Sequence, residues 1–270
     1  MMFVMFSYDK TVFIQKGPSY MNELQRRPVV VMNFSGIYRL EPFAMDKRLT
    51  HIDCSDISGT DGYCTREAAA KIGKRIAKLG PAGIHFIDNG NYHYVTKLWT
   101  DMIQEPFRLI LFDHHTDMQP SKIPGLLSCG SWVREMLIHN KHLKEVTVLG
   151  TPAGAERRAT QEWRRRVLFD DEELIHRHQI KMPDDIGRCP VYVSIDKDVL
   201  STKEVVTNWD QGKVTLAELK AILDYILAHE RVIGMDVCGE YDLCHSLFED
   251  EQAADLDSHA NESILKEAVS

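Results

Sequence analysis

The sequence predicts a doubly wound α/β fold around a mostly parallel central sheet. Short apolar runs rich in β-branched residues alternate with longer segments of helical period. Several of these runs are apolar on both faces, as expected for parallel strands covered by helices on each side. No internal repeat and no Pro/Gly/Ser-rich linker divides the 270 residues, so we expect one domain over residues 1–270.

The apolar runs give the strand predictions in chain order. They fall at residues 29–32, 49–54, 84–87, 109–112, 146–149, 191–195 and 232–237. The opening residues 1–6 are also apolar, but they lack a basic lead and are too short for the core of a signal peptide. We therefore expect a first strand or a packed arm there.

Helices are predicted between the strands. The first carries apolar residues on one face, at Ala68, Ile72, Ile76 and Leu79. A second spans about residues 92–104, and a third begins at Thr215, where Thr-Leu-Ala-Glu forms a capping box. After Asp242 the chain turns acidic, and we expect a loop followed by a final helix.

The charge balance bears on the classes of partner and on localisation. The chain has 32 basic and 40 acidic residues, a net charge of −8, so a nucleic-acid partner is not expected. No apolar run is long enough to cross a bilayer, so no membrane partner is expected either. The six cysteines contain no CxxC pair, and without an export signal we expect reduced thiols in a cytoplasmic protein.

Polar side chains gather where four predicted strands end. Asp113, His115 and Asp117 follow the strand at 109–112, and alternate residues of an extended segment project the same way. Asp196 and Asp198 follow the strand at 191–195 with the same spacing. The other two ends carry His93, after a Gly-Asn turn, and the pair Asp236 and Glu240. Because functional groups collect at the carboxyl edge of open α/β sheets, we expect these side chains to converge.

The residue types at this edge favour metal binding. Four carboxylates in one cleft repel each other unless cations neutralise them. Two divalent cations would do so, and mixed imidazole and carboxylate ligands suit Mn²⁺ or Zn²⁺ better than Ca²⁺. Such a pair lowers the pKa of a bridging water and supplies hydroxide near neutral pH.

Taken together, His93, the motif Asp113-x-His115-x-Asp117 and the run Ser194-Ile195-Asp196-Lys197-Asp198 resemble the ureohydrolases, the family of arginase, agmatinase and formimidoylglutamase. The resemblance extends from about residue 28 to residue 242. It implies the arginase/deacetylase fold, a three-layer α/β/α sandwich with a binuclear Mn²⁺ centre. It also implies a homo-oligomer, because such enzymes commonly form trimers or hexamers.

The resemblance implies a role for each ligand position. His93, Asp113, Asp117 and Asp196 would bind one metal, and His115 and Asp198 the other, with Asp113 and Asp196 bridging. Asp117 would also move a proton from the hydroxide to the leaving amine. Glu240 would receive the guanidinium of the substrate, with Asp242 as its competitor because the spacing from Asp236 is one residue longer than in the family.

The chain departs from the family motifs in three places. His114 replaces the alanine of DAHxD, and Ser201-Thr202 stands where the second motif ends in Asp-Pro. The loop at residues 127–132 lacks the substrate-side histidine of arginases and carries Cys129, for which we expect a packing role. These departures argue against strict specificity for arginine.

The predicted function is hydrolysis of a linear C–N bond in a small guanidino or amidino substrate by a metal-dependent enzyme. Mn²⁺ is the expected cofactor, two ions per chain, with Zn²⁺ or another divalent metal as the alternative. Two other functions stay open: a deacetylase-like amidohydrolase, which needs only one metal, and a family member that binds a ligand without turnover.

Overall fold

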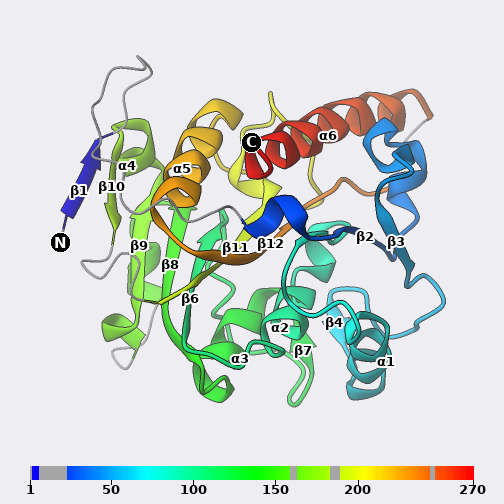
Figure 1. Ribbon diagram of the computed structural model, residues 1–270, viewed down its shortest axis with the longest axis horizontal. Helices are drawn as coiled ribbons and strands as arrows, with labels where there is room; N and C mark the ends of the chain where they lie inside the picture. The colour runs from blue at the N-terminus through cyan, green and yellow to red at the C-terminus, as the bar shows by residue number, and fades with distance from the viewer. Residues whose placement is uncertain (1, 6–22, 159–162, 183–188, 244–246) are drawn as a thin grey trace.

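The main sheet of the computed structural model has eight strands, all parallel. Their spatial order is β3-β2-β5-β12-β11-β6-β8-β9, which places β5, β12, β11 and β6 at the centre (Figure 1). The structure describes residues 2–5, 23–158, 163–182, 189–243 and 247–270. The strands are β2 Val29–Asn33, β3 Thr50–Asp53, β5 Ile84–Phe86, β6 Phe107–Phe112, β8 Leu143–Thr151, β9 Val167–Asp171, β11 Val191–Asp196 and β12 Val232–Cys238.

The sequence predicted seven of these eight strands, and those seven are confirmed. It missed β9, the edge strand next to β8. Only Val167 and Asp170 of its five residues are buried, so β9 lacks the continuous apolar character that marks the central strands.

Two small antiparallel sheets accompany the main one. β1 Met2–Met5 pairs with β10 Gln179–Met182, which confirms a first strand for residues 2–5; Met1 and Phe6 lie outside the described residues. β4 Tyr63–Cys64 pairs with β7 Leu127–Ser128. This second pair ties the loop before the first long helix to the loop that follows β6.

Helices cover both faces of the main sheet, as the predicted three-layer sandwich requires (Figure 1). One face packs against α1 Arg66–Ile76, α2 Val95–Thr100 and α3 Trp132–His139. The other packs against α4 Glu172–His176, α5 Leu216–His229 and α6 Leu247–Ala268. Alternate strand residues supply the two cores: Val193 and Ile195 face α5 and α6, whereas Tyr192 lies in the opposite cluster.

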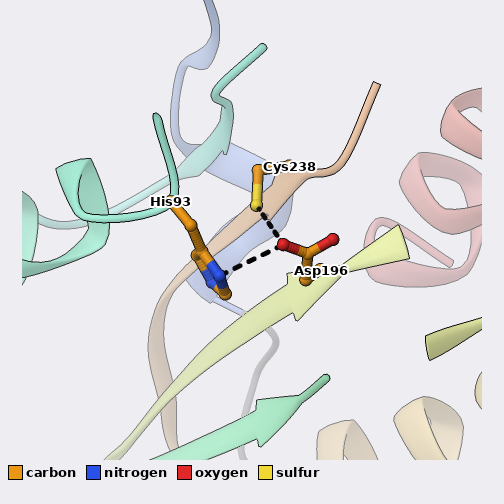
Figure 2. A group of neighbouring side chains, drawn as sticks. All are labelled: His93, Asp196 and Cys238. Atoms are coloured by element: carbon orange, nitrogen blue, oxygen red, sulfur yellow. Dashed lines mark hydrogen bonds and ion pairs between the residues drawn. The ribbon is translucent and has the colours of Figure 1, made fainter. Parts of the chain in front are cut away.

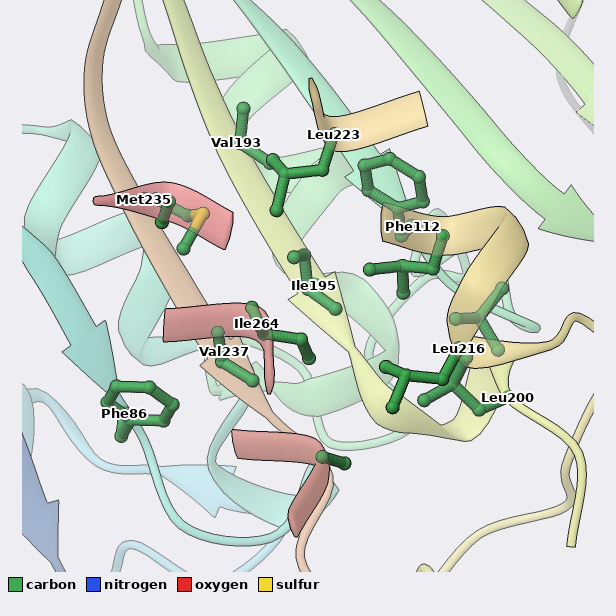
Figure 3. Close-up of a cluster of buried hydrophobic side chains, with 14 of the residues drawn as sticks. Phe86, Phe112, Val193, Ile195, Leu200, Leu216, Leu223, Met235, Val237 and Ile264 are labelled. Atoms are coloured by element: carbon green, nitrogen blue, oxygen red, sulfur yellow. The ribbon is translucent and has the colours of Figure 1, made fainter. Parts of the chain in front are cut away.

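The core under α5 and α6 is built from apolar side chains of several central strands (Figure 3). Phe112, Ile195 and Val237 come from three different strands and are fully buried. Leu223 of α5 and Ile264 of α6 close this core from above. This packing fixes the strands whose carboxyl ends carry the candidate ligands.

The predicted helices are present, with changes at their ends. α5 begins with the expected capping box, in which Thr215 and Glu218 bond each other's backbone N–H. The second helix is shorter than the predicted 92–104, because the backbone around α2 forms i→i−3 bonds: His93 to Gly90 before it and Ile103 to Thr100 after it. The acidic residues 249–251 lie inside α6, whereas residues 244–246, including Cys244, are outside the described part.

Two further observations concern the predicted class of protein. The five cysteines in the described ranges are free thiols. No described helix combines the length and the apolar character that crossing a membrane requires.

Candidate metal centre

Four neighbouring central strands deliver the candidate ligands to one edge of the sheet. β5 leads through a 3-10 helix, Gly90–Tyr92, to His93, and Asp113 directly follows β6. β11 ends in Asp196, with Asp198 in the following turn, and β12 ends in Cys238. Because all four strands are parallel and adjacent, their carboxyl ends meet, as the sequence predicted.

The loop after β6 places Asp117 by two devices. The residue has a left-handed backbone with φ of 50°, which is uncommon for a non-glycine residue. Its Oδ2 accepts a 2.5 Å hydrogen bond from Nε1 of the buried Trp132 in α3. Asp117 is therefore held toward the sheet edge by both its backbone and its side chain.

Asp198 joins the loops after β11 and β6. Its Oδ1 accepts a 3.0 Å bond from the backbone N–H of His114, and its Oδ2 lies 2.7 Å from Nδ1 of His115. Asp196 caps the turn that carries Asp198, since its Oδ1 accepts the Asp198 N–H at 3.0 Å. His114 thus serves this site through its backbone.

His93 is oriented from behind. Its Nε2 lies 3.0 Å from Oγ of Ser194, which donates a 2.6 Å hydrogen bond to Oδ1 of Asp236. Its Nδ1 lies 3.2 Å from Oδ2 of both Asp117 and Asp196. A ring held at one nitrogen and aimed at carboxylates with the other is the usual arrangement of a metal-binding histidine.

The donor atoms of the site fit divalent cations. Nδ1 of His93 and Oδ2 of Asp113 are buried and make no hydrogen bond, although they lie only 3.5 Å apart. Buried polar atoms without partners are rare, and a cation between them would satisfy both. Three sets of side chains place their donor atoms within 4.8 Å of one another: His93, Asp113 and Asp117; Asp113, His115 and Asp198; and His93, Asp196 and Cys238.

Asp113 belongs to two of these sets and therefore lies between two candidate positions. The first position is beside His93 and the second beside His115. The structure thus brings together all six ligands that the sequence proposed, and it adds Cys238, which sequence analysis missed. Cys238 continues the buried run of β12 and so resembles a core residue in the sequence. Only the pairing of β12 with β11 places it beside Asp196.

The electrostatics of the cluster show the cost of its bare carboxylates. Burial, followed by the charges of Asp117 and Asp198, raises the pKa of Asp113 well above its usual range. Burial, followed by the charge of Asp196, raises the pKa of Asp198 to about 6. Burial opposes a charged His115, but its hydrogen bonds with Asp113 and Asp198 raise the pKa of that imidazole to about 12. Cations would offset this mutual repulsion.

A cavity of about 300 Å³ opens onto the cluster. Five of the six predicted ligands line it, whereas His93 lies buried behind the wall. Trp209 forms one side: its indole Nε1 bonds Oδ1 of Asn91 at 3.0 Å, and its ring meets the ring of His115 edge-on. Sequence analysis missed Trp209; the one signal for it was a large aromatic residue within a polar stretch of sequence. Tyr63, Gln119, Lys122 and Cys129 also line the cavity.

Cys129 lines this cavity as a thiol. Burial, followed by the charge of Asp117, raises its pKa to about 12. A neutral thiol is a weak nucleophile, and the side chain borders the cavity, whereas a packed residue was expected from sequence.

The position of Glu240 contradicts the role expected for it. Its side chain is fully buried away from the cavity, with one oxygen on the ammonium of Lys197 and the other on Nδ2 of Asn261 at 3.0 Å. Both oxygens are used inside the protein, so Glu240 is not placed to receive a guanidinium. Its competitor Asp242 accepts a 2.9 Å bond from Nδ2 of Asn89 and is not among the described residues that line the cavity.

Comparison with known proteins agrees with this geometry. The model of the family described as "Arginase family" matches residues 22–240, most of the chain and all the candidate ligands. The chain belongs to the arginase family. An uncharacterized protein of Thermotoga maritima is 36% identical to this arginase-family chain over 160 residues, which is 59% of each protein.

Solved structures of the same fold include two enzymes named for C–N chemistry. Formimidoylglutamase from Bacillus subtilis is 16% identical, with a TM-score of 0.59 over 88% of this chain and 86% of its own. Proclavaminate amidino hydrolase from Streptomyces clavuligerus is 18% identical, with a TM-score of 0.59 over 94% of both chains. At these identities the likeness establishes the arginase-like α/β fold.

Proposed function

We propose that this arginase-family protein is a two-metal hydrolase that cleaves a linear C–N bond in a small guanidino or amidino compound. The observation that carries the proposal is Asp113, which lines the cavity and whose carboxylate belongs to two of the three ligand sets. One shared carboxylate between two histidine-containing sets is suited to a closely spaced pair of cations. Two structural neighbours, formimidoylglutamase and proclavaminate amidino hydrolase, are named for substrates of this class, which supports the proposal.

A pair of divalent cations, Mn²⁺ or another metal that accepts imidazole and carboxylate, would supply a strong nucleophile at neutral pH by lowering the pKa of water. His93, Asp113, Asp117 and Asp196 would hold the first ion, and Asp113, His115 and Asp198 the second.

We assign proton transfer to Asp117. Its carboxylate lines the cavity, and Trp132 holds Oδ2 by a hydrogen bond. In hydrolysis, water adds to the amidine carbon, the C–N bond breaks, and the leaving nitrogen gains the proton that the water loses. Asp117 would accept this proton and return it to the departing amine. The products are an amine and urea, or formamide from a formimino substrate.

Substitution of two candidate ligands, Asp113 and Asp196, tests the proposal. Asp113→Asn and Asp196→Asn should each abolish metal binding, measured by elemental analysis, together with release of urea or amine from a panel of guanidino and amidino compounds. Retained turnover in a metal-free variant would refute the mechanism. Absence of turnover across the whole panel with Mn²⁺ and Zn²⁺ would instead favour a member that binds without catalysis.

The deacetylase-like alternative differs in metal count. That chemistry needs one metal, whereas the set of Asp113, His115 and Asp198 supplies a second position. Two ions per chain are therefore expected, and a stoichiometry of one, with deacetylation of an acetylated amine, would support the alternative.

A further inference from the structure

We propose that Cys238 is a ligand of the cation beside His93, so that this position binds a thiophilic divalent metal through nitrogen, oxygen and sulfur. The inference rests on the proposed two-metal centre and deepens it, because it separates the two positions by chemistry. The second position, at Asp113, His115 and Asp198, has no sulfur among its donors.

Strand register brings the thiol to the site. β11 and β12 are parallel neighbours in which Asp196 stands opposite Cys238 and Ser194 opposite Asp236. Residues two apart in a strand share a face, so all four side chains point to the same side. The ring of His93 lies along that side, with Nε2 at the level of Ser194 and Nδ1 at the level of Asp196.

The residue after Cys238 allows the two strand ends to approach closely. Gly239 has φ of +93°, and a Cβ there would lie 2.4 Å from Oδ1 of Asp196 and 2.8 Å from the backbone nitrogen of Lys197. Only glycine fits this backbone and this space. The end of β12 therefore lies directly against the ligand turn after β11.

The three donor atoms are close enough to share one ion (Figure 2). Sγ of Cys238 lies 3.3 Å from Oδ2 of Asp196, and this same oxygen lies 3.2 Å from Nδ1 of His93. All three donors lie within 4.8 Å of one another. With metal–sulfur bonds of about 2.3 Å and metal–nitrogen bonds of about 2.0 Å, ligands around one ion are separated by distances in this range.

An independent observation marks the space between these atoms as a ligand site. His93 is 1% exposed, and its Nδ1 makes no hydrogen bond although it lies close to the carboxylates of Asp196 and Asp117. Cys238 is also fully buried, so its thiol has no water to exchange with. The thiol donates its hydrogen bond to Oδ2 of Asp196. Metal binding would release this S–H proton to solvent, and Nδ1 of His93 and the thiolate would then share the cation with Asp196.

The chemical consequence is a choice of metal. Thiolate ligands favour Zn²⁺, Fe²⁺ or Co²⁺, whereas carboxylates and carbonyls suit Mn²⁺ and Mg²⁺. We therefore expect the His93 position to select a thiophilic ion and the His115 position to accept Mn²⁺. The sequence expectation of two Mn²⁺ ions per chain, with Zn²⁺ or another divalent metal as the alternative, becomes an expectation of two different ions.

Cobalt substitution tests the ligand directly. Metal-free protein loaded with Co²⁺ should show a thiolate-to-cobalt charge-transfer band in the near ultraviolet. The band should disappear in Cys238→Ser and persist in Cys129→Ser, the matched control for a thiol that lines the same cavity. Zn²⁺ affinity should fall about 10-fold or more in Cys238→Ser, with little change in Mn²⁺ affinity at the other position.

The outcomes separate this inference from the function. Two bound Co²⁺ ions without a charge-transfer band, or a band lost in Cys129→Ser, would overturn the role of Cys238 while leaving the two-metal hydrolase intact. Failure to bind any metal would overturn both. Should Cys238→Ser not fold, the ¹¹³Cd NMR shift of the wild-type protein decides, because cadmium bound to sulfur resonates far from cadmium bound only to oxygen and nitrogen.

Discussion

At the scale of single residues, the candidate site depends on side chains that touch no substrate. Trp132 fixes the carboxylate of Asp117, and Ser194 with Asp236 fixes the ring of His93. Such supporting hydrogen bonds orient ligands and keep proton-transfer groups in reach. Their loss is expected to affect activity while the fold remains.

Trp132→Phe tests this support. The variant removes the Nε1 hydrogen bond to Asp117, so we expect about a 10-fold to 100-fold loss of kcat or of metal affinity. Trp99→Phe is the matched control: Trp99 is equally buried, but its Nε1 makes no hydrogen bond. Steady-state rates and metal titrations of the two variants should differ, and equal losses would contradict a positioning role for Trp132.

His85 gives a residue-scale prediction about stability and pH. It lies within β5, stacks on Trp99, and its Nδ1 is 3.1 Å from the hydroxyl of Tyr192. Burial lowers its pKa from 6.5 to about 3, as expected for the core histidine of a buried strand. Because the folded pKa is lower than the unfolded one, the unfolded chain binds the proton, and stability is lost as the pH falls below 6.5.

The test compares the free energy of unfolding of the wild type with that of His85→Gln, both free of metal. Between pH 7.5 and pH 5.5 the free energy of unfolding of the wild type should fall by about 1.4 kcal/mol more than that of the variant. Urea denaturation at the two pH values measures this difference. If the free energy of unfolding changes equally with pH in the two proteins, folding does not lower the pKa of His85.

At the scale of elements, a buried charge cluster connects the ligand turn after β11 to the helix α6. Lys197, between the candidate ligands Asp196 and Asp198, pairs with Glu240 after β12 and lies 3.7 Å from Asp257 of α6. Asn261 of the same helix bonds Glu240. This network explains why Glu240 is turned away from the cavity: the buried ammonium needs its carboxylate.

Lys197→Met should be strongly destabilising. It leaves the carboxylates of Glu240 and Asp257 buried without their cation, a change that costs about 3–5 kcal/mol. Lys220→Met is the control, because Lys220 also links to α6, through Glu267, but at the surface, where a pair contributes about 0–1 kcal/mol. Urea denaturation distinguishes them, and a loss below 1 kcal/mol for Lys197→Met would exclude the network as a structural tie.

At the scale of the whole molecule, the metal centre is expected to stabilise the fold. The candidate ligands come from four separate stretches of chain, at the ends of β5, β6, β11 and β12, and their carboxylates repel one another when bare. A cation binds the folded arrangement and not the dispersed residues of the unfolded chain. Binding therefore adds to the free energy of unfolding.

Removal of metal tests this coupling. At a free metal concentration about 100 times the Kd, binding contributes about 2.7 kcal/mol, so treatment with a chelator should lower Tm by about 5 °C or more. Return of Mn²⁺ or Zn²⁺ should restore it. In Asp113→Asn the chelator should have no effect, and a metal-independent Tm in the wild type would contradict the coupling.

The sequence by itself determined the features that depend on local pattern. Seven strands of the main sheet follow from apolar runs, and the position of Asp113, His115 and Asp117 directly after one of them placed these residues at the carboxyl edge of the sheet. The parallel sheet follows from alternation with helices, and it places the strand ends together. The fold class needed no more than this, whereas the set of six proposed ligands also rested on the resemblance to the ureohydrolases.

Only the tertiary structure decided what depends on strand order and register. β12 lies between β5 and β11, although it is last along the chain, and this order brings Cys238 to Asp196. The same order places Glu240 beside Lys197. Trp209 lines the cavity, and only the tertiary structure shows it there. Local pattern specifies which way a side chain points from its own strand. Which partner it meets is set by the packing of segments far apart in the sequence, and so it could not be predicted here.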